Sequence, residues 1–293
     1  MRLSTFHYSL GLIGYPLSHS LSPKIHTAAL KACGLQGEYS LFPIPPEDKQ
    51  GLQDLLTRLR AGELHGLNVT IPHKQNVIEF LDELTPTAKS ISAVNTIYLR
   101  DSKLIGDNTD AAGFLSDLHS FFGNRKSEIE NRKSVLVLGA GGSARAVVYT
   151  LLNDGWNVTI SARRIEQAHD LAGTVTEYKV QVTSYDDFQL STFNLLINTT
   201  PVGMSPNVDS SPLPNDVSLK PDMFVYDLVY NPRETKLVRD ARAQGLSAAT
   251  GLGMLIEQAA LSFEIWTGHN PPRETLYGAV SNLQSPISNS PIL

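Results

Sequence analysis

The sequence is poor in cysteine, with Cys33 as the only one among its 293 residues. A single cysteine excludes an internal disulfide framework and any metal site built from several cysteines. Long apolar runs are also missing: none approaches the roughly 18 residues that cross a bilayer. The N-terminal residues 1–10 lack the apolar stretch of a signal peptide. We therefore expect a cytoplasmic protein with no membrane partner.

The chain also lacks a basic surplus, because 24 Lys and Arg face 29 Asp and Glu, for a formal net charge of −5. A nucleic-acid-binding protein normally carries a basic surplus or a basic stripe, so we expect no nucleic-acid partner. At about 150 residues per domain, the length indicates two domains, each large enough to bury a core.

Short β-branched or Leu-rich runs alternate with helical patterns through most of the chain, which is typical of the α/β class with mainly parallel sheets. In the first half we predict strands at 10–14 and 66–71, a hairpin at 94–99 and 103–105, and a helix after Asp110. Another helix begins at Ser22, where Ser22 would be the cap. A further helix after Pro72 would bury an apolar stripe and end at 85–86; the stripe is Val77, Ile78, Leu81 and Leu84.

The second half begins with an all-apolar strand at 135–138, as expected where a parallel strand is covered on both faces. Further strands are predicted at 157–161, 194–198 and 224–228, with crossover helices at 165–171 and 234–243. A long helix at 252–267 stops at Gly268. The polar stretch 124–133 is the best candidate linker, and the tail after Ser281, rich in Ser, Pro and Asn, is expected to be disordered.

A glycine-rich turn lies between the all-apolar strand and the helix that follows it, with the sequence Gly139-Ala140-Gly141-Gly142-Ser143-Ala144. Glycines have no Cβ, so the backbone can approach a pyrophosphate, and the amides of the helix N-terminus supply donors to it. The alternative is a tight strand-to-helix turn without a ligand. The combination of strand, glycines and helix favours a doubly wound dinucleotide-binding domain.

The end of the second strand of this domain indicates which dinucleotide binds. An NAD site usually has Asp or Glu there to accept from the ribose 2′-hydroxyl. Here the stretch ends in Arg163 and Arg164, with no carboxylate before Glu166. Two guanidinium groups suit a 2′-phosphate, whereas a solvated arginine pair at a helix start would be electrostatically unfavourable. The pattern predicts NADP as the cofactor.

Several small polar residues occupy positions where the sequence pattern favours apolar or turn residues. They are Ser20, Ser22, Asn68, Thr70, Lys74, Asn95 and Asp110 in the first half, and Gln258 in the long C-terminal helix. Each has an ordinary alternative, with Ser22 and Asp110 as helix caps and Lys74 as a solvated charge. Together they offer hydroxyls for a carboxylate, amides for alcohols, and a Lys/Asp pair for proton transfer. A cofactor half and such a polar half indicate an oxidoreductase with its site in the cleft between them.

Seven segments of the chain resemble the shikimate dehydrogenase family. They are SLSPKIH (20–26), NVTIPHK (68–74), AVNT (93–96), GDNTD (106–110), NTTPVGM (198–204), YDLVY (226–230) and GLGMLIEQAA (251–260). The segments occur in the order of that family and extend over nearly the whole chain. One departure lies in the adenosine loop, where the family often has Asn-Arg-Thr and this chain has Ala162-Arg163-Arg164.

The resemblance implies the reversible, NADP-dependent reduction of 3-dehydroshikimate to shikimate, without a metal. It implies that Lys74 and Asp110 are the catalytic pair and that they contact substrate hydroxyls together with Asn95 and Gln258. The carboxylate end would be held by Ser20, Ser22, Thr70 and Tyr230, and we add Asn68 to the substrate-binding set. Gly139, Ala140, Gly141, Gly142 and Ser143 would form the phosphate loop, and Thr200, Met204, Leu228 and Gly251 the nicotinamide pocket.

The resemblance also implies a discontinuous substrate domain. We assign residues 1–112 to this domain, completed by 252–281, and residues 113–251 to the Rossmann-like NADP domain, with 282–293 as the tail. Two alternatives stay open: a quinate/shikimate dehydrogenase that uses NAD, and a non-catalytic dinucleotide-binding regulator of the same fold. The oligomeric state is expected to be a monomer or a homodimer.

Overall fold

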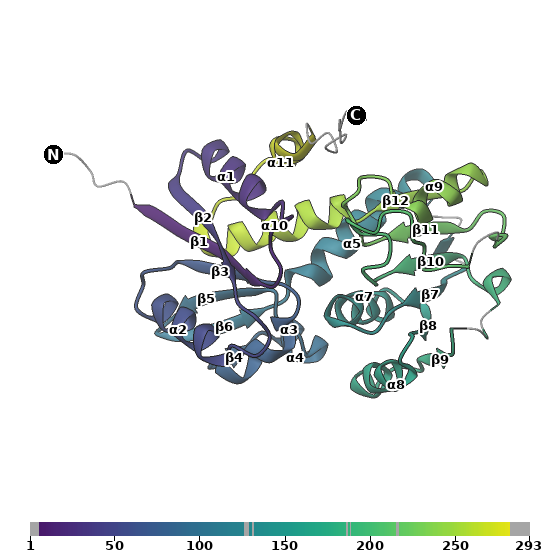
Figure 1. Cartoon of the computed structure of the whole chain (residues 1–293), viewed down its shortest axis with the longest axis horizontal. Helices are drawn as coiled ribbons and strands as arrows, with labels where there is room; N and C mark the ends of the chain where they lie inside the picture. The colour runs from purple at the N-terminus through teal and green to yellow at the C-terminus, as the bar shows by residue number, and fades with distance from the viewer. Residues whose placement is uncertain are drawn as a thin grey trace, which may run out of the picture.

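The structure, a computed structural model, describes residues 6–125, 129–130, 132–185, 187, 189–214 and 217–281. Figure 1 shows two lobes with long helices running between them. Each lobe is built on a six-stranded sheet. The tail 282–293 and residues 126–128 and 131 of the predicted linker lie outside the described residues. The predicted α/β class with two domains is confirmed.

The sheet of the first lobe has the strand order β2-β1-β3-β5-β6-β4. Its strands are β1 (His7–Gly14), β2 (Gln36–Pro43), β3 (Gly66–Val69), β4 (Glu83–Leu84), β5 (Thr96–Arg100) and β6 (Lys103–Asp107). β1 pairs in parallel with β2 and β3, whereas β5 is antiparallel to both β3 and β6. This sheet is therefore mixed, because the predicted hairpin of β5 and β6 places an antiparallel unit between β3 and the edge strand β4.

The sheet of the second lobe is entirely parallel, with the order β12-β11-β10-β7-β8-β9. Its strands are β7 (Ser134–Leu138), β8 (Asn157–Ser161), β9 (Gln181–Thr183), β10 (Leu195–Asn198), β11 (Phe224–Asp227) and β12 (Ser247–Thr250). Numbered within the lobe this order is 3-2-1-4-5-6, the arrangement of dinucleotide-binding folds. The predicted doubly wound fold is confirmed.

Helices cover both sheets and join the lobes. The first lobe carries α1 (Ser22–Ala32), α2 (Lys49–Arg60), α3 (His73–Asn76), α4 (Pro86–Ile91) and α11 (Arg273–Ser281), and the second α7 (Gly142–Asn153), α8 (Ile165–Thr174) and α9 (Lys236–Ala243). Short 3-10 helices span Val77–Phe80, Gly123–Arg125 and Leu190–Thr192. The helices α5 (Thr109–Phe122) and α10 (Leu252–Thr267) pack on each other across the junction (Figure 1). No helix of the described part is long and apolar enough to span a bilayer.

Apolar packing fixes how the lobes meet. Met254 of α10 is buried and packs in the apolar core of the second lobe. A smaller cluster joins Ile91 and Ala111 of the first lobe to Ala146 of α7. Burial of such side chains stabilises this arrangement of the lobes, at about 25 cal/mol per Å² of apolar surface. The two halves of the predicted site are therefore held facing each other.

The helix predicted from Pro72 to residue 84 is wrong. Four residues form α3, a 3-10 turn follows, and the chain becomes extended at Leu81 before entering β4. Two contacts to strand β6 explain the break: the amide of Asp82 donates to the carbonyl of Leu104, and the amide of Leu104 donates to the Asp82 carboxylate at 2.7 Å. Pairing with a neighbouring strand thus overrides a spacing that fits a helix.

Two predicted helix caps are also wrong. Leu21 rather than Ser22 is the N-cap of α1, with no side-chain cap, and Ser22 lies in the first turn of the helix. Asn108 rather than Asp110 caps α5, accepting from the amide of Ala111 at 3.3 Å. Neither Ser22 nor Asp110 therefore serves as the N-cap of its helix. The ordinary explanation for each of these polar residues is therefore removed.

Candidate active site

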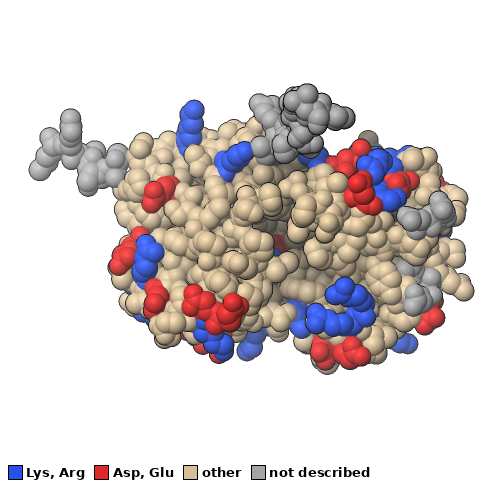
Figure 2. Space-filling view, in the orientation of Figure 1, with Lys and Arg blue, Asp and Glu red and all other residues tan. Residues whose placement is uncertain are grey.

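The molecule is hollowed between its two lobes, as Figure 2 shows. Lys74, on the short helix α3, and Asp110, in the first turn of α5, meet on the side of the first lobe. The Lys74 Nζ lies 2.5 Å from the Asp110 Oδ2, and the two side chains are only 10% and 7% exposed. The alternative of Lys74 as a solvated surface charge is therefore wrong. A buried ion pair is costly unless its remaining hydrogen bonds are made.

The backbone around Lys74 is fixed on both sides. The carbonyl of Lys74 accepts from the amide of Val94 at 2.7 Å, which ties α3 to the segment before β5. A ring nitrogen of the neighbouring His73 lies 2.6 Å from the carbonyl oxygen of Ile44, and the His73 side chain is buried. Contacts within the protein thus hold the lysine in place without a bound substrate.

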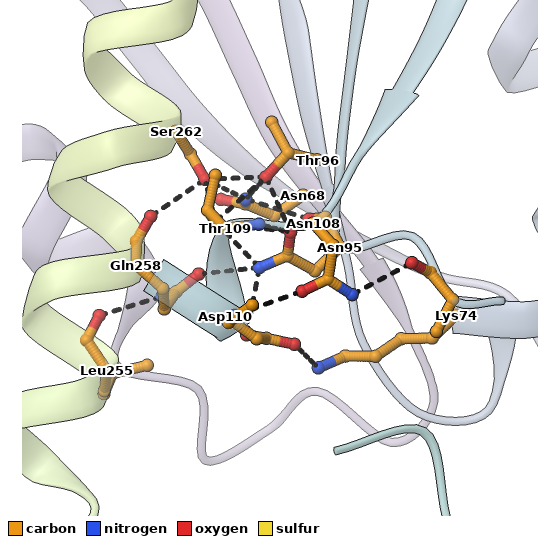
Figure 3. A network of polar contacts seen from close by, with 12 residues as sticks. Asn68, Lys74, Asn95, Thr96, Asn108, Thr109, Asp110, Leu255, Gln258 and Ser262 are labelled. Atoms are coloured by element: carbon orange, nitrogen blue, oxygen red, sulfur yellow. Dashed lines mark hydrogen bonds and ion pairs between the residues drawn. The ribbon is translucent and has the colours of Figure 1, made fainter. Parts of the chain in front are cut away.

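Asn95 lies at the centre of the polar group that Figure 3 shows. Its Nδ2 is 2.9 Å from the Asp110 Oδ1 and 3.3 Å from the Gln258 Oε1. Its Oδ1 accepts from the amide of Thr109 at 2.7 Å. Four predicted hydroxyl-contacting residues, from α3, α5, α10 and the loop before β5, therefore form one connected group.

Asn68 extends this group on the side away from Lys74 (Figure 3) and is 5% exposed. Its Nδ2 donates to the Ser262 Oγ at 3.0 Å, and its Oδ1 accepts from the hydroxyl of Tyr39 at 2.8 Å. The Ser262 Oγ is in turn 2.7 Å from the Thr96 Oγ1. Asn68, Thr96 and Ser262 thus form a closed polar network, which we call the floor of the site (Figure 3).

Sequence reasoning missed Thr96 and Ser262 as members of this floor, and Tyr39 as a partner of Asn68. Tyr39 lies on β2, a strand that we did not predict. Ser262 is four residues after Gln258 and therefore on the same face of α10, which was the one available signal. Thr96 adjoins Asn95, but nothing in the sequence indicates that its hydroxyl would meet Ser262, 166 positions away.

The residues predicted at the carboxylate end come from both lobes. The Ser20 Oγ accepts from the amide of Ser22 at 3.3 Å, and the Ser22 side chain is largely buried. Thr70 follows β3 directly, and its amide donates to the carbonyl of Ile13 at 2.8 Å. Tyr230 lies in the loop after β11, where burial raises the pKa of its hydroxyl.

The glycine-rich turn has the geometry that a pyrophosphate loop needs. Gly139 has φ +108°, and a Cβ there would lie 2.5 Å from the Thr199 Oγ1. Gly141, the N-cap of α7, faces open space. A Cβ on Gly142 would lie 3.4 Å from the Lys74 Cβ, so the turn reaches the predicted catalytic lysine. The phosphate-loop residues and the acid–base pair therefore adjoin one cleft.

Arg163 and Arg164 are exposed at the start of α8, directly after strand β8. Exposed guanidinium groups at this strand end suit a 2′-phosphate. Arg145, in the first turn of α7, was not predicted. Burial lowers the pKa of its guanidinium, and its Nε makes no hydrogen bond within the described residues. Figure 2 shows basic side chains gathered over α7, beside the hollow.

The four residues predicted around the nicotinamide lie in loops at the carboxyl ends of β10, β11 and β12. A Cβ on Gly251 would lie 2.2 Å from the carbonyl oxygen of Leu228, so only glycine fits there. Thr200 follows β10, and Met204 lies further along the same loop with 46% of its surface exposed. These loops meet the glycine turn at the edge of the sheet where ligands of open α/β folds bind. The described residues contain no His, Cys, Asp and Glu cluster able to hold a metal.

Three family descriptions match the chain. "Shikimate dehydrogenase substrate binding domain" matches residues 12–97, "Shikimate / quinate 5-dehydrogenase" residues 123–235, and "Shikimate 5'-dehydrogenase C-terminal domain" residues 251–280. A shikimate dehydrogenase (NADP(+)) of Salinibacter ruber is 42% identical over 278 residues, which are 92% of this chain and 95% of the relative.

Solved structures match over nearly their whole length. One is the shikimate 5-dehydrogenase of Thermus thermophilus in complex with NADP(H) and shikimate, with 35% identity and a TM-score of 0.81, covering 93% of this chain and 98% of that one. Another is the quinate dehydrogenase of Corynebacterium glutamicum in complex with NAD, with 31% identity and a TM-score of 0.85, covering 94% and 99%.

Proposed function

The chain belongs to the shikimate dehydrogenase family, and we propose that Lys74 and Asp110 perform the acid–base step of its reaction in the cleft between the lobes. The activity is the NADP-dependent, reversible reduction of 3-dehydroshikimate to shikimate. It is an oxidoreduction at a CH–OH group within the shikimate pathway, which leads to the aromatic amino acids. The observation that carries the proposal is the buried contact of 2.5 Å between the Lys74 Nζ and the Asp110 Oδ2, beside the glycine turn.

Lys74 acts on the oxygen at C3 of the substrate. NADPH, when bound, supplies the hydride that reduces this carbon, so negative charge develops on the oxygen. The ammonium of Lys74 stabilises that charge and donates the proton, and in the reverse direction its neutral amine accepts it. General acid–base help of this kind contributes about 10²–10⁴-fold to the rate. Asp110 pairs with the ammonium and holds the lysine toward the substrate.

The remaining polar residues orient the substrate. Asn95 and Gln258 contact ring hydroxyls, because their amides lie in the same hydrogen-bonded group as Asp110. Ser20, Ser22, Thr70 and Tyr230 hold the carboxylate. Asn68 supports the group on the side away from Lys74, since its amide already bonds to Tyr39 and Ser262.

The second lobe would hold the cofactor. The loop from Gly139 to Ser143 holds the pyrophosphate, Arg163 and Arg164 the 2′-phosphate, and Thr200, Met204, Leu228 and Gly251 surround the nicotinamide. Support comes from the positive φ at Gly139, from the open space at Gly141, and from the exposed guanidinium groups after β8.

We further propose the domain division of residues 1–112 with 252–281, and of 113–251. The separate sheets and the packing of α10 and α11 on α1 favour it. A cytoplasmic location suits a charged cofactor and a charged substrate that do not cross membranes unaided. The choice between a monomer and a homodimer stays a prediction, and size-exclusion chromatography with light scattering decides it.

A crossed activity assay tests this function. NADPH and NADH are each combined with 3-dehydroshikimate, and NADP⁺ and NAD⁺ each with shikimate and with quinate, while the absorbance of the reduced nicotinamide is followed. We expect the highest kcat/KM with the NADP(H) and shikimate pairs. A preference for NAD⁺ with quinate favours the alternative suggested by the similarity to the Corynebacterium quinate dehydrogenase. No turnover with any pair, in protein that still binds NADPH, favours a dinucleotide-binding regulator.

A further inference from the structure

A fully buried carboxylate at the end of β11 has no part in the reaction described above. Asp227 is 0% exposed, and its two oxygens accept three hydrogen bonds. The Oδ1 accepts from the Asn198 Nδ2 at 2.8 Å and from the amide of Val229 at 3.0 Å. The Oδ2 accepts from the hydroxyl of Thr235 at 2.6 Å.

The three donors to Asp227 belong to three separate segments. Asn198 ends β10, Val229 lies in the loop after β11, and Thr235 is the N-cap of α9, where its Oγ1 also accepts from the amide of Val238 at 3.3 Å. Asp227 therefore ties the end of β10 to the loop and the helix that both follow β11.

The network continues into the residues assigned to the nicotinamide pocket. The Asn198 Oδ1 accepts from the amide of Thr200 at 3.0 Å and from its hydroxyl at 2.6 Å. Leu228 directly follows Asp227, and its amide donates to the carbonyl of Asn198 at 2.9 Å. The amide of Gly251 donates to the carbonyl of Val229 at 3.3 Å. One carboxylate is thus connected to Thr200, Leu228 and Gly251.

An ionised aspartate fits this position better than a neutral amide would. Two of the three donors are N–H groups, which cannot reverse to become acceptors. Burial raises the pKa of Asp227 to about 6, while Thr235, Val229 and Asn198, which are all uncharged, oppose that shift through their hydrogen bonds. Keeping a charge in a dry interior is unfavourable, so its hydrogen bonds must offset a substantial desolvation cost.

We propose that Asp227 is a positioning residue that fixes the loops carrying Thr200 and Leu228 for the nicotinamide end of the cofactor. The proposal rests on the assignment of NADP binding to this lobe. Asp227 acts through Asn198 and the backbone of Val229, because its own oxygens are buried and already accept hydrogen bonds.

The variant Asp227→Asn tests this proposal because it keeps the side-chain shape and replaces one acceptor oxygen with an NH₂ group. We expect its affinity for NADPH, measured by calorimetry, to fall about tenfold, as the loss of one or two buried hydrogen bonds predicts. Its affinity for adenosine 2′,5′-bisphosphate, which lacks the nicotinamide half, should stay within about twofold. Asp240→Asn, which removes a surface carboxylate of α9 paired with Lys236, is the matched control and should change neither affinity.

A second pair of variants keeps the test decisive if Asp227→Asn does not fold. Thr235→Val removes one donor to Asp227 and should weaken NADPH binding about threefold, again without loss for the bisphosphate, and Thr235→Ser should restore it. Wild-type NADPH affinity in folded Asp227→Asn or Thr235→Val, or an equal loss for both ligands, overturns the proposal. Failure of the wild-type enzyme to reduce 3-dehydroshikimate would instead refute the proposed function, since the binding comparison does not depend on turnover.

Discussion

His26 should make the first lobe sensitive to acid. Its ring is fully buried and stacked on Tyr39, with centroids 4.3 Å apart, directly behind the floor of the site. Burial lowers the pKa of His26 from 6.5 to about 3. The folded state therefore keeps this ring neutral at pH values where the unfolded chain binds a proton. The stability that this group contributes is fully present above about pH 6.5 and is lost as the pH falls toward about 3.

The size of the effect follows from the two pKa values. Each pKa unit corresponds to about 1.36 kcal/mol, and about pH 5 lies about 1.5 units below the unfolded pKa. Between about pH 7 and about pH 5, His26 should therefore remove about 2 kcal/mol from the free energy of unfolding. The variant His26→Phe keeps an aromatic ring among Phe263 and Trp266. Between the same two pH values, its free energy of unfolding should fall by about 2 kcal/mol less than that of wild type.

Urea unfolding at these two pH values measures the difference. Trp266 lies in the same lobe, with its ring centroid 5.4 Å from that of His26, and a Trp156→Phe background leaves Trp266 as the only tryptophan. Any packing cost of phenylalanine at position 26 is independent of pH and cancels in the comparison. His7→Phe, at an exposed position of β1, is the control and should retain the wild-type loss. Equal losses for wild type and His26→Phe would refute this reasoning.

Three further substitutions test the ligand assignments. Gly251→Ala should raise the KM for NADPH about tenfold or more, because its Cβ would meet the Leu228 carbonyl at 2.2 Å; an unchanged KM would contradict the tight contact. Ser22→Ala should raise the KM for shikimate about 10- to 100-fold with little change in kcat, as the loss of a hydrogen bond to a charged group predicts; a change in thermal stability alone would contradict that role. Arg163→Ala should weaken NADPH binding about tenfold and leave NADH binding unchanged, and an equal effect on both would separate Arg163 from the 2′-phosphate.

The second lobe could be predicted from the sequence more completely than the first. Strands β10 and β11 consist of buried residues, as does β7 after its first residue, and such runs are easy to identify. The C-terminal helix α10 was predicted with the bounds that the structure has, since Gly268 ends it in the left-handed conformation. The short edge strands β9 and β12 were missed, because half-exposed strands of three or four residues leave no clear pattern.

In the first lobe, β2 and α2 were missed. β2 lies at the sheet edge, where its residues alternate between partly buried and exposed, and Gly37 and Pro43 obscure the strand pattern. The candidate site was predictable where a side chain is unusual for its position in the sequence pattern, as Lys74 is because a positive charge is unfavourable at the start of a helix. Its floor was not predictable, because the contact of Asn68 with Ser262 joins residues 194 positions apart. Only the tertiary fold brings such residues together.

The most direct test of the acid–base role is the kcat of Lys74→Met with both ligands saturating. Methionine fills a similar volume beside Gly142 without the ammonium, so substrate and cofactor should still bind. We predict a kcat lower by about 10²–10⁴-fold, with the dissociation constant for NADPH within about threefold of wild type. A kcat within about threefold of wild type would contradict the assignment of Lys74 as the acid and base of this enzyme.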